Sequence, residues 1–494
     1  MKEKICLNKK LKTILKKVEI KNDYLVPDIK PDVVNVINTN GMVYLIKEQV
    51  ENGKIKIEGN IDNYIVYLSV EGENRSVSNT INFFEVIEDE RINENVIVNV
   101  KAMILSMETK VLNERKLSTT IYLVLKIELS EENEIEVVTD LEGKDKQKLE
   151  KKYNIKNILT RKTVNSSLND VLKINDDHKI TEILKIDIEV ALKETKMSFN
   201  KLLAKSEINI KVIYLDENRS VKMIIGTFPL MTFIETENVS ENYYTDFDYI
   251  VRNVFFKIQN EGNSIEFQID FEIRSVIFEE KELNILEDVY SLERKLKVES
   301  ENVNIELFNK ENDGNYFNIK IDENFKIDNI VKVLGNDIKY NVIDKKMVNN
   351  IYNYECEMIN DIYYEISNDK NIRISQIKIP FIYKSEKNYE VDEIELISKE
   401  LKVNLIGENI NISAEIENVI EKNNIIPLNI IKEVYDEAYI DLNDYNLIIY
   451  FVKENDTIWK IAKKFNVSFE NLLKVNNLNK DDVLEIGRKI YIMK

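Results

Sequence analysis

Most of the chain alternates apolar and polar residues with a period of two, which is the pattern of a β-strand with one buried face. Clear runs are residues 54–61 (KIKIEGNI), 207–215 (EINIKVIYL) and 264–273 (SIEFQIDFEI). Asn52 and Gly53 stand between two such runs and predict a tight hairpin, because both central residues of its turn need a positive φ. The pattern therefore predicts a mainly β chain of antiparallel strands.

The same order of motifs occurs three times at intervals of about 145 residues, which indicates an internal repeat. The clearest echo is YLSVEGENRSV (67–77) against VIYLDENRSV (212–221), and a looser third copy ends near Arg373. The two clear copies place Arg75 and Arg219 at equivalent positions. These arginines are either shared binding groups or, more simply, charged residues that end a strand.

The pattern changes near residue 450. Residues 450–453 predict a short strand, and the apolar residues that follow have the i, i+3, i+4, i+7 spacing of one helical face: Ile458, Ile461, Ala462 and Phe465. Ser468 is placed to cap a second helix, and Asn476 with Asn477 is a good terminator because asparagine tolerates the left-handed conformation. Residues 484–492 supply a returning strand. The predicted order is βααβ.

This tail, residues 450–494, resembles the LysM family along its whole length. The resemblance implies binding of N-acetylglucosamine-containing glycans in a groove between the loop after the first strand and the loop before the last. The usual Gly-Asp-Thr of the first loop is Asn-Asp-Thr here, and the usual Pro-Gly of the second loop is Ile-Gly. Carried over to this chain, the groove residues are Asn455, Asp456, Thr457, Ile458, Leu484, Glu485 and Ile486.

Two residues of the tail have a second interpretation. Asp456 is either a groove residue or only a cap of the first helix. Trp459, the single tryptophan, is either a stacking surface for a sugar or partly buried structure, and we expect the latter because aromatic residues dominate protein cores.

The body resembles another family, the SPOCS repeat of spore coat and sporulation proteins of clostridia and bacilli. The shared pattern is Pro-Asp with aliphatic residues, a hairpin, a strand ending in Tyr-Leu, a charged turn and a strand of proline and aromatic residues. Several such repeats before one LysM module resemble clostridial spore coat morphogenetic proteins of the SipL type. We therefore expect three tandem antiparallel β-rich SPOCS-type repeats at 1–148, 155–295 and 300–440, and a small βααβ LysM module at 446–494. Lysine-rich residues 141–157 read as a linker with some helical propensity.

The resemblance implies a non-enzymatic adaptor of spore envelope assembly. Such a protein is made in the mother-cell cytoplasm, lies at the forespore surface and links coat layers to it. The implied partners are a spore coat morphogenetic ATPase of the stage IV sporulation protein A type and other coat proteins. The alternative function is binding of peptidoglycan, or another N-acetylglucosamine glycan, of the cell or spore wall.

The composition supports a folded chain of several domains. The 494 residues are 44% hydrophobic, 32% charged and 9% aromatic, which argues against disorder. The net charge of −19 is carried by the body, because the residues from Asn446 onward have a net charge of +3. An acidic body disfavours nucleic acid and anionic lipid as partners, since both are negatively charged.

Targeting signals and cysteines favour an intracellular protein. The N-terminus has positive charge without the apolar run of a secretion signal. No stretch reaches the roughly 18 apolar residues of a spanning helix, so we expect no membrane insertion. Cys6 and Cys356 lie far apart in sequence, which suits a reducing compartment better than a disulfide framework.

Residues for catalysis are scarce. His178, the single histidine, has no recognisable thiol partner for a Cys/His hydrolase, and with Asp176 and Asp177 it supplies too few ligands for a metal site. The chain has no G-x-x-x-x-G-K-[ST] loop for a nucleotide. Two carboxylates suffice for a glycosidase, but no repeat carries an obvious extra carboxylate motif. We expect no enzyme activity, no metal and no cofactor.

Overall fold

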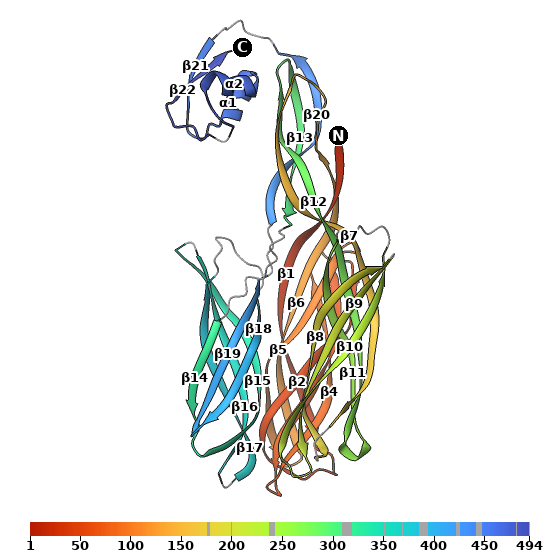
Figure 1. The fold of residues 1–494 in the computed structure, drawn as a ribbon. Helices are drawn as coiled ribbons and strands as arrows, with labels where there is room; N and C mark the ends of the chain where they lie inside the picture. The colour runs from red at the N-terminus through yellow and green to blue at the C-terminus, as the bar shows by residue number, and fades with distance from the viewer. Residues whose placement is uncertain are drawn as a thin grey trace.

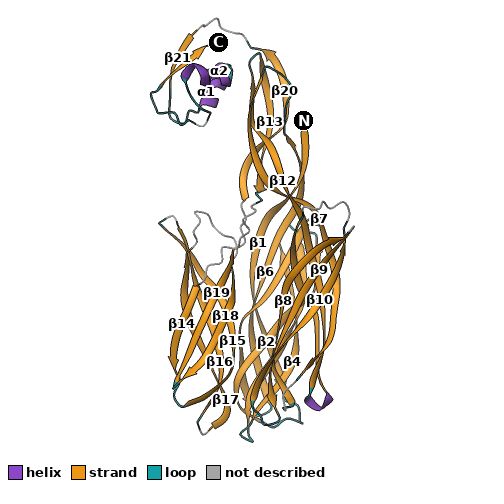
Figure 2. Ribbon diagram, viewed as in Figure 1, coloured by secondary structure: helices purple, strands orange, loops and turns teal. Residues whose placement is uncertain are grey.

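A computed structural model describes residues 1–174, 178–198, 200–236, 243–308, 319–349, 351–367, 369–384, 394–420, 425–440, 447–480 and 482–493. Strands dominate these residues, and the two α-helices among them lie in the C-terminal module (Figure 2). The prediction of a mainly β chain that ends in a βααβ module is confirmed.

Repeat 1 consists of two three-stranded antiparallel sheets. We call the first a meander sheet, because its consecutive strands pair in the order β2-β3-β4: β2 (Val33–Glu51), β3 (Lys54–Ser69) and β4 (Asn74–Glu88). The second, the ribbon sheet, has the order β1-β6-β5: β1 (Lys2–Leu25), β5 (Ile97–Asn113) and β6 (Lys116–Val138).

Repeat 2 has the same two sheets. Its meander sheet, in the order β10-β9-β8, contains β8 (Ile180–Ser198), β9 (Lys201–Asp216) and β10 (Val221–Glu235). Its ribbon sheet, in the order β11-β12-β7, contains β7 (Lys146–Lys173), β11 (Tyr244–Gln259) and β12 (Ser264–Ser291), with the short 3-10 helix η1 (Asn260–Gly262) before β12.

Repeat 3 keeps this plan, but two described strands stand in place of each of the long strands β7 and β12 of repeat 2. The meander sheet contains β15 (Ile330–Val348), β16 (Ile351–Ile366) and β17 (Asp369–Lys384). The ribbon sheet is split into two parts: β14 (Ile319–Lys326), β19 (Asn409–Ile420) and β18 (Ile394–Ile406) form one, and β13 (Arg294–Glu306) and β20 (Ile425–Tyr439) form the other.

The two sheets of a repeat pack face to face and enclose its core. In β3 the alternation in the sequence explains the packing, because Ile55, Ile57 and Ile61 are fully buried while Lys56 between them is only half-buried. The predicted hairpin turn between β2 and β3 is present, and Gly53 has φ +80°, which glycine adopts at little cost. Asn52 does not have a positive φ, so the expectation of a positive φ at both central residues is wrong for Asn52.

The first and last strands of each repeat continue past the meander sheets as two-stranded ribbons, and the three ribbons pack together as a stalk (Figure 1). The ribbons are β1 with β6, β7 with β12, and β13 with β20. All six strands contribute to the stalk core: Ile5, Leu7, Ile135, Val137, Tyr153, Ile155, Leu283, Ile285, Ile305 and Ile430. The stalk therefore ties the three repeats together at one end.

The meander sheets contact one another in a cyclic order. The last meander strand of each repeat contacts the first meander strand of the next: β4 contacts β8, β10 contacts β15 and β17 contacts β2. Val66, Ile213 and Tyr363, which lie near the ends of β3, β9 and β16, share one buried cluster. The ring of three repeats thus closes within a single chain.

The C-terminal module contains β21 (Leu447–Phe451), α1 (Ile458–Phe465), α2 (Phe469–Asn476) and β22 (Lys489–Met493). Its two strands pair antiparallel. Both helices begin at a hydroxyl cap, Thr457 and Ser468, and both end at an asparagine in the left-handed region, Asn466 and Asn477.

Residues 141–157 do not form the helix that their composition favours. β7 begins at Lys146, and Tyr153 and Ile155 lie buried in the stalk core. Burial against ribbons from distant parts of the chain outweighs the local propensity of the lysine-rich sequence.

Candidate binding site in the C-terminal module

The two loops predicted to form the groove lie side by side. The N–H of Gly487 donates to the Val452 carbonyl at 2.8 Å, and the N–H of Val452 donates to the Arg488 carbonyl at 3.0 Å. Gly487 has φ +84°, so a glycine fits this turn better than any residue with a side chain. The loop before β22 is thereby joined to the end of β21.

Asp456 braces the first loop and does not cap the helix. Its Oδ2 accepts from the Tyr450 hydroxyl and from the Lys453 N–H, both at 2.8 Å. Burial alone would raise the pKa of Asp456, but these hydrogen bonds outweigh it and hold that pKa below its usual range. Because the Thr457 hydroxyl caps α1, the interpretation of Asp456 as a helix cap is wrong.

The seven predicted groove residues differ in exposure. Four are exposed: Asn455, Thr457, Glu485 and Ile486. Two are half-buried: Asp456 and Leu484. Ile458 is only 3% exposed, and its side chain belongs to the module core. Ile458 therefore offers a ligand its backbone alone, and replacing its side chain would test folding as much as binding.

Trp459 is buried, as expected, and it also joins the module to the stalk. Its Nε1–H donates to Asp288 Oδ2 of β12 at 2.8 Å, and its ring meets the Tyr290 ring edge-on with centroids 5.0 Å apart. The Lys463 ammonium, one turn further along α1, donates to the other Asp288 oxygen at 2.5 Å. Trp459 is 7% exposed, so it has no face free for a sugar.

Two further hydrogen bonds complete this contact. The Tyr290 hydroxyl donates to the Val467 carbonyl at 2.7 Å, and Gln147 Oε1 of β7 accepts from the Phe469 N–H at 3.1 Å. Figure 1 shows α1 and α2 on the side of the module that faces the stalk. We call the whole contact the stalk joint: Gln147, Asp288, Tyr290, Trp459, Lys463, Val467 and Phe469.

Sequence reasoning missed the stalk half of this joint. Asp288 and Tyr290 lie in the run ILEDVYS, which carries no motif, and their partners follow roughly 170 residues later. The one usable signal was the tryptophan itself, because a lone indole on a small module commonly needs a hydrogen-bond acceptor when it is buried.

The equivalent arginines Arg75 and Arg219 act inside the body. Both approach the Glu182 carboxylate of β8, at 3.7 and 3.3 Å, and Lys30 pairs with the same carboxylate at 2.7 Å. Glu182 is buried at the contact between repeats 1 and 2, where it also accepts from the Ser76 N–H. The two arginines therefore help to hold these repeats together, which is the structural alternative of the two interpretations.

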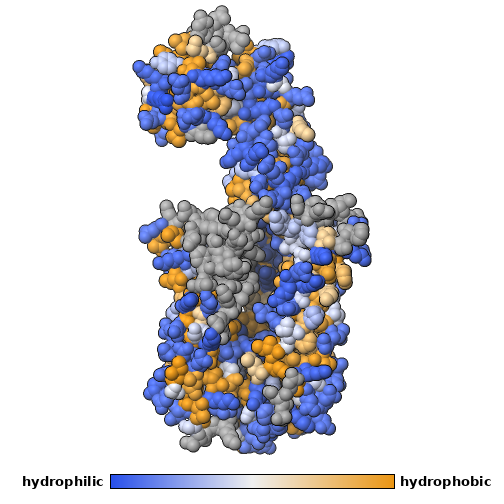
Figure 3. Space-filling view, in the orientation of Figure 1, coloured by the Kyte–Doolittle hydropathy of each residue, from blue (hydrophilic) through white to orange (hydrophobic). Residues whose placement is uncertain are grey.

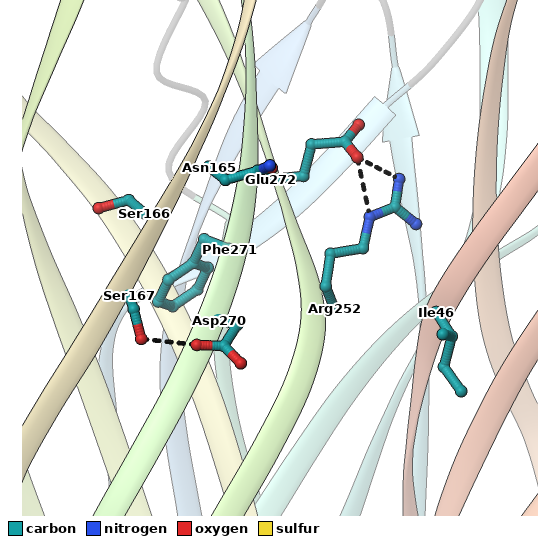
Figure 4. Close-up of a pocket in the computed structure, with 8 residues that line it drawn as sticks. All are labelled: Ile46, Asn165, Ser166, Ser167, Arg252, Asp270, Phe271 and Glu272. Carbon is teal, nitrogen blue, oxygen red and sulfur yellow. Dashed lines mark hydrogen bonds and ion pairs between the residues drawn. The ribbon is translucent and has the colours of Figure 1, made fainter.

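A hollow of about 470 Å³ lies between repeats 1 and 2 (Figure 4). Arg252 on its wall binds Glu48 of repeat 1 and Glu272 of repeat 2, at 2.7 and 2.9 Å. Burial alone would raise the pKa of Asp270 and of Glu272. The hydrogen bonds to Asp270, among them the one from the Ser167 hydroxyl, together outweigh burial and lower the pKa of Asp270. The guanidinium groups of Arg274 and Arg252 do the same for the pKa of Glu272. A glycosidase needs one carboxyl with the opposite shift, so this hollow has the character of a structural junction.

The other candidates for chemistry show no activation. Burial raises the pKa of the Cys6 thiol and raises that of Cys356 to about 11, which disfavours the reactive thiolate. His178 is described, but Asp176 and Asp177 lie outside the described residues. Among the residues that the structure describes, no group of three or more His, Cys, Asp and Glu side chains is placed to hold a metal ion.

Membrane spanning by a helix finds no support within the described ranges, where neither helix has the necessary length and apolar character. No solved structure matches the chain. Family models match three segments. Residues 32–112 and 179–259 match the SipL, SPOCS domain, and residues 450–492 match the LysM domain.

Each SPOCS match begins at the first meander strand of its repeat and ends with the fifth strand, so the stalk ribbons lie outside it. Both families are non-catalytic binding domains. The matches confirm the two resemblances drawn from the sequence, and the chain carries two SPOCS domains of the SipL type and a C-terminal LysM domain, which together indicate a sporulation-related protein with a module of the peptidoglycan-binding kind.

Proposed function

We propose that the protein is a non-enzymatic adaptor of the spore envelope. It links coat layers to the forespore surface in the mother cell, and its C-terminal module binds a coat basement-layer ATPase of the stage IV sporulation protein A type. The SipL-type domains support an association with the spore coat. Other coat proteins are the expected partners of the three repeats.

The stalk joint is the observation that carries this proposal. The module is fixed by its helices to the end of a three-repeat body, while four of its groove residues stay exposed. A binding head held on a large β body suits a protein that bridges two surfaces. The charges agree with this division, because the module has a net charge of +3 and the rest of the chain one of −22.

Glycan binding is the second candidate function. The exposed loop residues Asn455, Thr457 and Ile486 favour it, because the groove of LysM domains lies at these loops. The candidate ligands are peptidoglycan and related N-acetylglucosamine glycans.

Binding of the full-length protein to the purified ATPase and to insoluble peptidoglycan, measured side by side, separates the two functions. We expect saturable binding to the ATPase that is lost when residues 447–494 are deleted. Retention on peptidoglycan without ATPase binding would contradict the adaptor proposal. Glycan binding that Ile486→Ser abolishes, in a protein that remains folded, would support the second candidate.

A further inference from the structure

The strands of the C-terminal module carry an apolar surface on the side away from the helices. We call it the strand face: Leu447, Ile449, Phe451, Tyr491 and Met493. In the register of the two strands Leu447 lies opposite Met493 and Ile449 lies opposite Tyr491, so these side chains form one continuous patch. Each is between 43% and 54% exposed.

The sequence of β21 explains why this patch is unusual. Residues 447–452 (LIIYFV) are apolar without alternation, which is typical of a strand buried on both faces. The helices cover only one face, because Ile448, Tyr450, Val452, Ile490 and Ile492 turn toward them and join the module core. Figure 3 shows apolar side chains gathered on the strand side of the module. Clustered exposed apolar residues on a small domain commonly mark a binding surface.

Besides the exposed groove loops, two other sides of the module are occupied. The stalk joint uses the helices. At the edge of β22 the Asn476 side chain accepts from the Tyr491 N–H and donates to the Tyr491 carbonyl, both at 2.7 Å. The backbone N–H and carbonyl of Tyr491 are therefore not free to pair with a strand of a partner. Docking on the strand face is favoured over addition of a strand to this edge.

The described charged residues on the two strands, or within two positions of them in sequence, are basic, although exposed Glu454 follows Lys453 directly. In the described segments 447–453 and 488–493 the charged residues are Lys453, Arg488 and Lys489, and none is acidic. The Lys489 ammonium lies 5.9 Å from the centre of the Phe451 ring, at the border of the patch. An apolar surface with a basic rim fits a protein surface that is apolar with an acidic rim.

We propose that the strand face is the surface by which the module binds its protein partner, a protein whose own docking surface is apolar and bordered by carboxylates. The inference rests on the proposed adaptor function and assigns the protein contact to this face, separate from the groove loops. A protein is favoured over an anionic bilayer, because the acidic body beside the module is repelled by a negatively charged membrane.

Three full-length variants test the assignment against purified ATPase. Ile449→Ser with Phe451→Ser removes the centre of the strand face, Ile486→Ser changes the groove, and Val483→Ser is the matched control because Val483 is apolar and 90% exposed outside both surfaces. We expect the double variant to weaken binding about tenfold or more and the two single variants to leave it unchanged. Fluorescence of Trp459 reports whether each module is folded and docked.

The possible failures are distinct. Wild-type protein that does not bind the ATPase overturns the adaptor function, and the inference with it. Wild-type binding that survives in the folded double variant overturns the inference alone, and so does loss of binding in Ile486→Ser only. Sedimentation with phosphatidylglycerol vesicles and analytical ultracentrifugation complete the test: a strand face needed for vesicle binding or for self-association would overturn the assignment to a protein partner.

Discussion

One carboxylate of the stalk joint, Asp288, accepts hydrogen bonds from both the Trp459 indole and the Lys463 ammonium of the module. Asp288→Ala leaves the buried Nε1–H of Trp459 without its acceptor, and an unsatisfied buried donor costs about 1 to 3 kcal/mol. We expect the fluorescence of the only tryptophan to shift to longer wavelength and the module to unfold earlier in urea. Glu454→Ala, which removes an exposed carboxylate of the module, is the control. Identical spectra for both variants would contradict the joint.

Asp456 gives the module a dependence on pH. Its carboxylate accepts two hydrogen bonds that lower its pKa in the folded module. The ionised carboxylate therefore stabilises the module above the unfolded pKa of about 3.9. This stability is lost as the pH falls through the lower folded pKa. Asp456→Ala should lower the free energy of unfolding of the module by about 1.5 to 3 kcal/mol at pH 7. Urea unfolding followed by Trp459 fluorescence should show a smaller difference at pH 3. An equal difference at both pH values would mean that the ionised carboxylate is not the cause.

Local chemistry could be predicted for single residues, and distant contacts could not. Ser468 and Asn477 could be recognised because capping and termination depend on neighbours in the sequence. Of the two interpretations of Asp456, the helix cap fails because the donors that it serves, Tyr450 and Lys453, lie before it in the chain and not in the helix.

The elements of the meander sheets could be predicted from alternation, whereas the ribbons of the stalk could not. A ribbon buries few residues on each strand, and it buries them against two other ribbons from distant parts of the sequence. Lysine-rich β7 therefore has few apolar positions, such as Tyr153 and Ile155, to show its period of two.

Shortening a buried side chain in the stalk core should destabilise the protein as much as the same change in the core of any repeat. Ile285 of β12 is fully buried there, and Ile285→Ala should reduce the free energy of unfolding by about 2 to 5 kcal/mol. Leu15→Ala is the control, since Leu15 of β1 is 68% exposed and surface substitutions typically change stability by about 0.5 kcal/mol or less. Circular dichroism in urea measures both. Equal midpoints would show that the ribbons do not pack as described.

In the whole molecule, the module and the body are not independent. The body contributes Tyr290, Leu149 and Leu292 to the core of the module. Deletion of residues 447–494 exposes these side chains, and we expect the body to lose about 2 to 4 kcal/mol of unfolding free energy, the value for one or two large apolar side chains. Thermal unfolding of the truncated and full-length proteins measures the difference. Unchanged melting of the body would mean that the module is only tethered.

The cyclic arrangement of the repeats could not be predicted from the sequence, for a physical reason. Periodicity shows which face of a strand is buried but not which neighbour covers it. Tyr363 of repeat 3 is an example. No sequence pattern indicates its neighbours, yet it packs against Val66 and Ile213 of the other two repeats.

Closure of the ring between repeats 2 and 3 depends on a buried ion pair. The Lys185 ammonium of β8 binds Asp337 of β15 and lies 2.9 Å from Asp187. Burial alone would lower the pKa of Lys185 and raise that of Asp337, but the charges outweigh it: the two aspartates raise the pKa of Lys185, and Lys185 lowers that of Asp337. Both groups are therefore charged between about pH 4 and pH 10.

Asp337→Asn should loosen this closure, because it removes the charge of one of the two carboxylates that pair with Lys185, a lysine that is only 4% exposed. Breaking a buried pair costs about 3 to 5 kcal/mol, and we expect the lower value since Asp187 remains. The Asp337 contribution is present above pH 4 and disappears as the pH falls through its lowered folded pKa. The difference between the urea midpoints of wild type and variant should therefore be largest above pH 4 and become smaller as the pH is lowered below 4, whereas exposed Asp328→Asn should match wild type throughout. A gap of the same size at every pH would assign the stability of this contact to packing and not to charge.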